Sequence, residues 1–199
     1  MRTGIYGGSF NPVHNGHIHL ADSAAEELGL DRIFLLPSGI SPHRSSLEYA
    51  PGDDRLEMLE LACIGHEKLI PCDFELRNAG KSYTVYTARE FRRRFPGDEL
   101  FLLVGSDMLM CFENWYRFEE ILRLVKLVAV SREKGDRGRL LEKAEMLRKF
   151  GEIFICNAPP EEISSTEIRK KIKKNENISC YLPENVVQYI EQNNLYLQR

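Results

Sequence analysis

The sequence lacks any apolar run approaching the roughly 20 residues of a membrane-spanning helix. It also begins without the apolar stretch of a secretory signal peptide. Cysteine is scarce: the sequence contains five. Their number is odd, and no two of them form a C-x-x-C pair. This spacing disfavours a disulfide scaffold and a cysteine zinc site. We therefore predict a cytoplasmic protein that does not bind a membrane.

A surplus of positive charge is also missing, because 27 lysines and arginines face 30 aspartates and glutamates, for a net charge of -3. Proteins that bind nucleic acid over a broad surface usually carry a large positive excess. We therefore predict no nucleic-acid partner and interpret the basic run at 169–174, apart from Arg169, as a solvated helix face. A few local cations can still bind a small anionic ligand.

What the sequence does have is an alternation of short apolar runs and longer amphipathic segments. The strand candidates are Gly4–Tyr6, Arg32–Leu36, Leu69–Cys72, Leu100–Val104, Lys126–Val130 and Ile153–Cys156. The helix candidates between them are Gly16–Leu28, Asp53–Ile64, Thr84–Phe95, Glu113–Leu122 and Arg137–Phe150. This alternation predicts an α/β fold, a Rossmann-like doubly wound parallel sheet covered on both faces.

The chain shows no internal repeat, low-complexity tract or linker, so we predict a single domain over residues 1–199. Its last part, about 164–199, is predicted to form a short helical cap of two helices. Ser164–Thr166 are cap-type residues, and Pro183 precedes a second apolar pattern. The segment 37–52 is predicted to be a loop after the second strand, where open α/β sheets bind ligands.

The most informative stretch is G-G-S-F-N-P-V-H-N-G-H at 7–17. A strand runs into Gly7 and Gly8, which permit close backbone approach, and a helix is predicted to start at Asn15–Gly16. The free N–H groups and positive dipole end of such a helix suit a phosphate. His14 and His17 are three residues apart, so both rings lie on nearly one face, where each can donate to phosphate oxygens.

Two other interpretations of this region remain open, and two nucleotide motifs are rejected. His14, His17 and His19 could ligate a metal, although no H-E-x-x-H pattern exists. The glycines and histidines could also be purely structural. A G-x-G-x-x-G motif is absent, and Gly80–Ser82 does not complete a P-loop because Glu75 stands at the required first glycine.

Two motifs at opposite ends of the chain carry a family resemblance. H-x-G-H after G-G-S-F-x-P resembles the first signature of the nucleotidyltransferase superfamily, and I-S-S-T-E-I-R at 163–169 is similar to its second. Within the superfamily the chain resembles the bacterial nicotinate-nucleotide adenylyltransferases. Further matching segments are Pro42–Arg44, Asp53–Ala62, Ser82–Thr84 with Thr87, Gly105–Asp107, Trp115 with Tyr116, and 182–196.

The resemblance implies a reaction in which nicotinate mononucleotide and ATP give deamido-NAD and pyrophosphate, a step of NAD biosynthesis. It implies Mg²⁺ as a cofactor that accompanies ATP. It also implies direct in-line attack of the mononucleotide phosphate on the α-phosphorus, which needs no enzyme nucleophile. Catalysis would then be mainly electrostatic and positional.

The resemblance assigns roles to individual positions of this chain. The catalytic residues it implies are His14, His17 and Arg44. The ATP-binding residues it implies are Gly7, Gly8, Ser9, Phe10, Gly105, Asp107, Ser165, Thr166 and Arg169, with the backbone N–H groups of the loop assisting. The mononucleotide-binding residues it implies are Thr84, Trp115 and Tyr116; Arg132 is a further candidate, from its position after a predicted strand, for the mononucleotide phosphate. No residue is assigned as a metal ligand.

Each assignment has a plainer alternative. Asp107 could cap a helix instead of accepting ribose hydroxyls, and Ser165 and Thr166 could belong to an ordinary helix start. Trp115 could be a core residue instead of stacking on the nicotinate ring. Arg132 follows a buried-looking strand and could equally well be unrelated to the mononucleotide phosphate.

Three positions depart from the family pattern. Arg44 stands where a lysine is usual, which keeps the charge but changes its shape and hydration. Asn11 and Tyr86 each stand where an aspartate is common. The functional alternatives are a related transferase that uses nicotinamide mononucleotide or another phosphate acceptor, and a non-catalytic nucleotide-binding module. The oligomeric state stays open, with a homodimer as one option.

Overall fold

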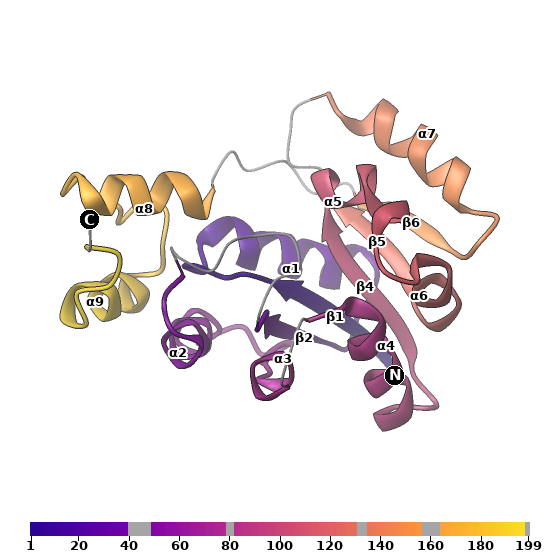
Figure 1. Cartoon of the computed structure of the whole chain (residues 1–199), viewed down its shortest axis with the longest axis horizontal. Coiled ribbons are helices and arrows are strands. Elements are labelled where there is room, and N and C mark those ends of the chain that lie inside the picture. Colours follow the sequence, from indigo (N-terminus) through magenta and orange to yellow (C-terminus); the bar gives the residue numbers. More distant parts are fainter. Residues whose placement is uncertain (40–48, 79–81, 131–134, 157–163, 198–199) are drawn as a thin grey trace.

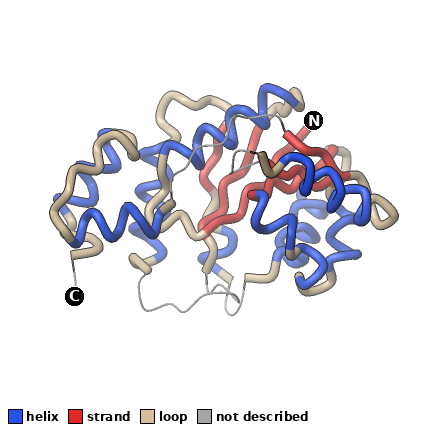
Figure 2. Tube along the Cα trace, turned by 90° about the horizontal axis from the view of Figure 1, so that it is seen from above, coloured by secondary structure: helices blue, strands red, loops and turns tan. Residues whose placement is uncertain are grey.

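The computed structural model describes residues 1–39, 49–78, 82–130, 135–156 and 164–197. Two residues with predicted roles, Arg44 and Arg132, lie outside these ranges. Figure 1 shows a central sheet between helices, with the two ends of the chain on opposite sides of the molecule. In the perpendicular view of Figure 2, the strands again lie side by side with helices around them.

The described strands form one six-stranded sheet in the order β3-β2-β1-β4-β5-β6, and every neighbouring pair is parallel. Their bounds are β1 Arg2–Gly8, β2 Arg32–Pro37, β3 Leu69–Pro71, β4 Glu99–Gly105, β5 Lys126–Val130 and β6 Ile153–Cys156. The predicted fold class is thus confirmed. The strands β2 and β3 are added on one side of β1, and the strands β4, β5 and β6 on the other side. The position between β1 and β4 is therefore a topological switch point, which opens a crevice at the carboxyl ends of the strands.

Helices cover both faces of the sheet, which explains why the strands read as continuous apolar runs. The longer helices are α1 Asn15–Glu27, α2 Gly52–Ala62, α4 Thr84–Arg94, α6 Phe118–Leu124, α7 Arg137–Leu147, α8 Ser165–Lys173 and α9 Glu184–Gln192. The short ones are α3 Phe74–Arg77, α5 Ser106–Met110 and the 3₁₀ turn η2 Phe112–Asn114.

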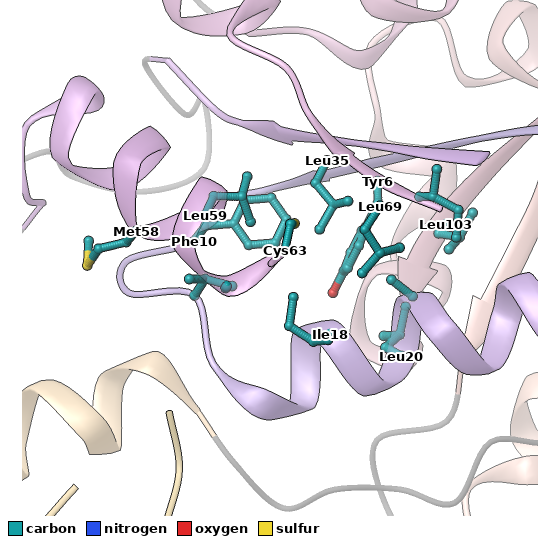
Figure 3. Close-up of a cluster of buried hydrophobic side chains, with 14 of the residues drawn as sticks. Tyr6, Phe10, Ile18, Leu20, Leu35, Met58, Leu59, Cys63, Leu69 and Leu103 are labelled. Carbon is teal, nitrogen blue, oxygen red and sulfur yellow. The ribbon is translucent and has the colours of Figure 1, made fainter. Parts of the chain in front are cut away.

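Two apolar cores lie on opposite faces of the sheet. The first contains buried side chains of α1, α2, α8 and α9, and Figure 3 shows Phe10, Leu59 and Leu35 packed between the sheet and the helices. The second contains buried side chains of α4, α5, α6 and α7. The C-terminal helices therefore close the first core, and α9 packs on α2 through the Tyr189 hydroxyl, which donates to Asp54 Oδ1 at 2.8 Å.

The structure corrects one predicted helix and adds two. The predicted helix Glu113–Leu122 is wrong, because η2 ends at Asn114 and α6 starts only at Phe118. Arg117 separates them in the left-handed conformation, with φ 57°. The short helices α3 and α5 were not predicted, since neither is long enough to show a periodic pattern.

The two helices predicted after Ser164 are confirmed as α8 and α9. Across the residues that the structure describes, no helix is both long and apolar enough to span a membrane.

Candidate active site

A cavity of about 270 Å³ lies at the carboxyl end of the sheet, between β1, β4 and the starts of several helices. Its wall brings together most of the residues singled out from the sequence. These are Gly7, Gly8, Ser9, His14, His17, Thr84, Gly105, Asp107, Trp115, Tyr116, Ser165 and Thr166. They come from both halves of the chain, so only the folded sheet places them around one space.

The loop after β1 is shaped by Phe10, whose backbone has a positive φ of 42° and whose side chain is fully buried. Its ring meets those of Tyr6 and His17 edge to face, at centroid distances of 5.4 and 5.0 Å. A Cβ on Gly8 would lie 3.0 Å from this ring, so a larger residue there would require the Phe10 ring to shift. Phe10 itself is not among the residues that line the cavity, and Figure 3 shows its side chain beside Leu59, in the first core.

The two histidines form a stacked pair at the start of α1. Their ring centroids are 3.6 Å apart with 30° between the planes. The backbone N–H of His14 donates to Nδ1 of His17 at 3.2 Å. Because Nδ1 is the acceptor, the neutral His17 ring carries its proton on Nε2, which can then donate to an anion. Both side chains are largely buried, at 5% and 8% exposure, yet both border the cavity.

A second helix start converges on the same loop. The Ser164 hydroxyl caps α8 by accepting from the Glu167 N–H at 3.2 Å, and Ser165 Oγ donates to the Pro12 carbonyl at 3.0 Å. Ser164, Ser165 and Thr166 line the cavity. The N-termini of α1 and α8 therefore both face it, and their dipoles favour negative charge there.

Arg169, predicted to bind ATP, lies beside the cavity residue Thr166, to whose hydroxyl its Nη2 donates at 3.4 Å. It is absent from the cavity wall, and its Nη1 donates to the Asn11 carbonyl at 2.9 Å. Asn11 is fully buried, and its Oδ1 accepts both from the Ala50 N–H and from the Tyr196 hydroxyl, each at 3.0 Å. The neutral amide that replaces the usual aspartate thus ties the loop to the C-terminal segment. Arg169 donates to the same residue, Asn11, and so connects α8 to this loop.

On the opposite wall, Thr84 begins α4, and Trp115 and Tyr116 follow η2. The Trp115 ring packs on Phe112 at 4.9 Å and on the second core, so one side of it is structural. It also lines the cavity, and its buried Nε1 has no hydrogen-bond partner. Tyr116 is 46% exposed, and the centroid of its ring lies 5.0 Å from that of the Tyr83 ring. Trp115 is therefore both a core residue and a flat surface open to a ligand.

Sequence reasoning missed Glu75, which is 8% exposed and lines the cavity. Its Oε1 accepts from the Thr87 hydroxyl at 2.7 Å. Burial raises the pKa of this carboxyl, and hydrogen bonds from Thr87 and Ser82 oppose the increase. The Ser82 hydroxyl in turn accepts from the Gly39 N–H at 3.1 Å. No sequence signal marks this cluster, because α3, α4 and the end of β2 meet only in the fold.

Arg55 was also missed, although it contacts the loop after β1. Its guanidinium, 3% exposed as a residue, donates to the Ser9 and Ser38 carbonyls at 2.8 Å and to the Ala50 carbonyl at 3.2 Å. Burial lowers the pKa of this guanidinium. Three carbonyl partners satisfy a buried cation without a carboxylate, so Arg55 joins the loops after β1 and β2.

The described ranges contain no cluster of three or more side chains that could hold a metal ion. The carboxylates of the cavity wall are Glu75 and Asp107. Asp107 is exposed in the first turn of α5, whereas Glu75 is engaged by hydroxyls. Mg²⁺ often reaches an active site together with the phosphates of its substrate and keeps several waters, so a cavity wall with few carboxylates fits an ion that arrives with a nucleotide.

The comparisons with known proteins agree with this arrangement. The sequence profile of the cytidylyltransferase-like family matches residues 5–171. A protein of Clostridium botulinum (strain Loch Maree / Type A3) named probable nicotinate-nucleotide adenylyltransferase is 37% identical over 195 residues, covering 96% of this chain and 97% of that one. A Clostridium novyi (strain NT) protein of the same name is 36% identical over 197 residues, 98% of each chain.

Among solved structures, the fold is similar to that of the Plasmodium falciparum nicotinic acid mononucleotide adenylyltransferase complexed with NaAD. The TM-score is 0.81 at 22% identity, over 98% of this chain and 97% of that chain. The same enzyme complexed with APC superposes with a TM-score of 0.79 at 21% identity, over 98% and 96%. At such identities the likeness establishes the fold.

Proposed function

This chain belongs to the cytidylyltransferase-like family, and within it to the nicotinate-nucleotide adenylyltransferases, and from that premise we propose how its cavity works. It transfers the adenylyl group of ATP to nicotinate mononucleotide, giving deamido-NAD and pyrophosphate in NAD biosynthesis. The observation that carries the assignment of the site is the stacked His14–His17 pair, held where two helix N-termini converge.

The chemical step is a direct displacement at phosphorus. A phosphate oxygen of the mononucleotide bonds to the α-phosphorus of ATP, and the bond from that phosphorus to the oxygen shared with the β-phosphate breaks. The electron pair of the broken bond leaves with pyrophosphate. The chain contributes position and charge, which is what such a transfer chiefly needs.

On the ATP side, the His17 Nε2–H and the His14 ring donate to phosphate oxygens as charge moves onto the leaving group. The N–H groups around Gly8 and Ser9 and the starts of α1 and α8 add fixed positive dipoles. Thr166 adds a hydroxyl from the α8 side, while Asp107 is suited to accept from a ribose hydroxyl. Arg44, outside the described residues, keeps its proposed contact with phosphate.

On the acceptor side, the open surface of Trp115 offers a stacking partner for the nicotinate ring. The N-terminal turn of α4 at Thr84, with the backbone beside Tyr116, provides N–H groups for the ring carboxylate. Positive dipoles favour the acid over the neutral amide. Arg132, also outside the described residues, is kept as a candidate for the mononucleotide phosphate.

Mg²⁺ is proposed as the accompanying cofactor, and the phosphates of ATP in the cavity would be its principal ligands. The ion would supply charge neutralisation of those phosphates. We also propose that the chain forms a single domain. We propose a cytoplasmic location as well, because none of the five cysteines forms a disulfide and free thiols persist in a reducing compartment.

Pyrophosphate release with ATP and a panel of acceptor phosphates tests this function. Nicotinate mononucleotide is expected to give the highest kcat/KM, with nicotinamide mononucleotide, phosphopantetheine and a sugar phosphate lower. A preference for the amide of more than about tenfold, some 1.4 kcal/mol, would refute the acid assignment. ATP binding without pyrophosphate release from any acceptor would instead identify a non-catalytic module.

A further inference from the structure

Tyr49 is a cavity residue to which neither the sequence motifs nor the mechanism above gives a role. It lies between the end of β2 and the start of α2, two residues before Pro51, the N-cap of that helix. It lines the cavity. Its hydroxyl oxygen is buried and has no hydrogen-bond partner among the residues that the structure describes.

A buried hydroxyl without a partner costs free energy, because water no longer hydrogen-bonds to it. Phenylalanine would fill the same volume without that cost. A tyrosine in a cavity wall is therefore explained most simply by a partner that arrives with the ligand.

The surroundings of Tyr49 identify the chemistry of that partner. The Arg55 guanidinium lies 5.5 Å from the centre of the Tyr49 ring, and the next residue, Ala50, donates its N–H to Asn11. Arg55 also binds the Ser9 carbonyl, so the Tyr49 ring is fixed beside the loop that faces the phosphates. A buried cation next to a hydroxyl donor favours an anionic acceptor.

We propose that Tyr49 is a substrate-binding residue whose hydroxyl donates a hydrogen bond to a phosphate oxygen in the cavity, with Arg55 positioning its ring. This inference rests on the proposed function, since ATP and the mononucleotide are the sources of phosphate. The triphosphate and the mononucleotide phosphate offer the same acceptor chemistry, and separate kinetic measurements tell them apart.

The test is Tyr49→Phe, which removes one oxygen and nothing else. The unliganded variant should melt at the wild-type temperature or slightly above it, because no protein hydrogen bond is lost. The kcat/KM should fall about tenfold with respect to one substrate, in line with loss of a hydrogen bond to a charged group. A fall for ATP assigns the triphosphate, and a fall for the mononucleotide assigns the acceptor phosphate.

Tyr189→Phe is the matched control. The Tyr189 hydroxyl donates to Asp54 of α2, and Tyr189 is not among the residues that line the cavity. It should lower the melting temperature and leave both kcat/KM values unchanged. Tyr49→Phe overturns the proposal if both kcat/KM values stay within threefold of wild type, or if the unliganded protein melts several degrees lower.

A binding measurement separates this proposal from the proposed function. ATP, nicotinate mononucleotide and adenosine are each added to wild type and Tyr49→Phe, and the ligand-induced rise in melting temperature is recorded. The variant should lose stabilisation by one phosphate-bearing ligand and keep any stabilisation by adenosine. If the wild type releases no pyrophosphate, this difference still decides the role of Tyr49, and equal stabilisation of both proteins by all three ligands overturns it.

Discussion

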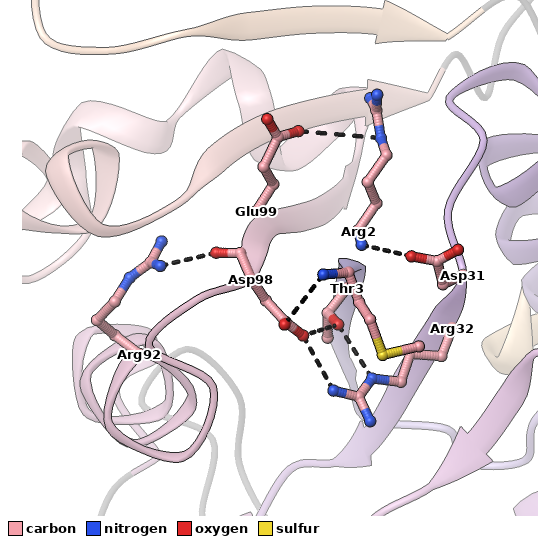
Figure 4. A network of polar contacts seen from close by, with 8 residues as sticks. Arg2, Thr3, Asp31, Arg32, Arg92, Asp98 and Glu99 are labelled. Atoms are coloured by element: carbon pink, nitrogen blue, oxygen red, sulfur yellow. Dashed lines mark hydrogen bonds and ion pairs between the residues drawn. The ribbon is translucent and has the colours of Figure 1, made fainter.

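The two ends of the sheet use polar groups in opposite ways. At the amino end, Asp98 accepts from the Thr3 hydroxyl at 2.6 Å, from Arg32 at 2.9 Å and from the N-terminal ammonium at 3.2 Å, as Figure 4 shows. At the carboxyl end, Trp115 Nε1 and the Tyr49 hydroxyl are buried without partners. The same strands thus end in a network complete within the chain on one side and in groups left for a ligand on the other.

This contrast shows what to look for in an uncharacterised α/β protein. The dense ion-pair network is the more conspicuous feature, but its charges are already neutralised. Among the described residues, the carboxyl end brings together glycines, buried histidines and helix N-termini around one cavity. Perturbing the carboxyl end should therefore change turnover, whereas perturbing the amino end should change stability alone.

The largest effect on turnover is expected from His17→Ala at the carboxyl end. Loss of the Nε2–H donor and of the ring stacked on His14 should lower kcat by a factor on the order of 10² to 10⁴. Steady-state pyrophosphate release measures this fall, and circular dichroism checks that the fold is kept. His19→Ala, on the same helix but outside the cavity wall, is the control. Near-normal turnover of His17→Ala would refute the role of His17.

Gly8→Ala should come next, because its Cβ would press on the Phe10 ring at 3.0 Å and shift the loop. A displacement of this kind near reacting groups is expected to lower kcat/KM by roughly 10- to 100-fold. Gly97→Ala is the matched change at the amino end, where a Cβ meets nothing within 4 Å. Equal kinetics of the two variants would break the comparison between the ends.

Arg55→Lys keeps the charge but cannot reproduce three hydrogen bonds to carbonyls in fixed directions. We expect the free energy of unfolding to fall by about 1–3 kcal/mol, as for buried acceptors left unpaired. We also expect the KM for ATP to rise, since Ser9 loses its anchor. Urea unfolding and initial-rate kinetics measure the two effects; a stability loss with unchanged kinetics would confine Arg55 to the fold.

Asp98→Asn should have the smallest effect, a loss of no more than about 1 kcal/mol with kcat/KM unchanged, because the Asp98 and Arg32 side chains keep 14% and 23% exposure and solvent screens their ion pair. Hydrogen bonds from Thr3, then Arg32 and the N-terminal ammonium, lower the pKa of the Asp98 carboxyl to about 2.

The sign of that shift also sets a pH dependence. Since the pKa of Asp98 is lower in the folded state, its contribution to stability is present above about pH 4 and is lost as the pH falls toward 2. Melting temperatures of wild type and Asp98→Asn should therefore converge on acidification. Parallel curves over that range would mean that another group accounts for the loss.

Much of the fold was predictable because it depends on local pattern. Apolar runs such as Leu100–Val104 alternate with amphipathic segments, and that alternation is sufficient for a parallel sheet with helices on both faces. The predicted helix at Glu113–Leu122 failed because its apolar spacing continues across Arg117, while the backbone there turns left-handed to place Trp115 and Tyr116. A single left-handed residue does not change the spacing of the apolar residues, so the sequence pattern does not reveal the break.

The candidate site was predictable only where its residues sit within one motif. Gly8, His14 and His17 follow one another closely enough for strand, turn and helix start to place them together. No such signal marks Glu75, Tyr49 and Arg55. Each of them is held at the site by contacts with residues of other helices or loops. Arg169, predicted from its motif to bind ATP phosphates, contacts the Asn11 carbonyl and the Thr166 hydroxyl, and its phosphate role stays a prediction.

The sequence by itself determined the fold class and the loop that offers histidines and N–H groups to a phosphate, because both depend on residues close together in the chain. Only the tertiary structure decided which groups support that loop and which face the cavity. Asn11 contacts Tyr196, which is 185 positions away, and Arg55 spans the ends of two strands. Burial and unmet hydrogen bonds arise from such long-range contacts, so no local pattern encodes them.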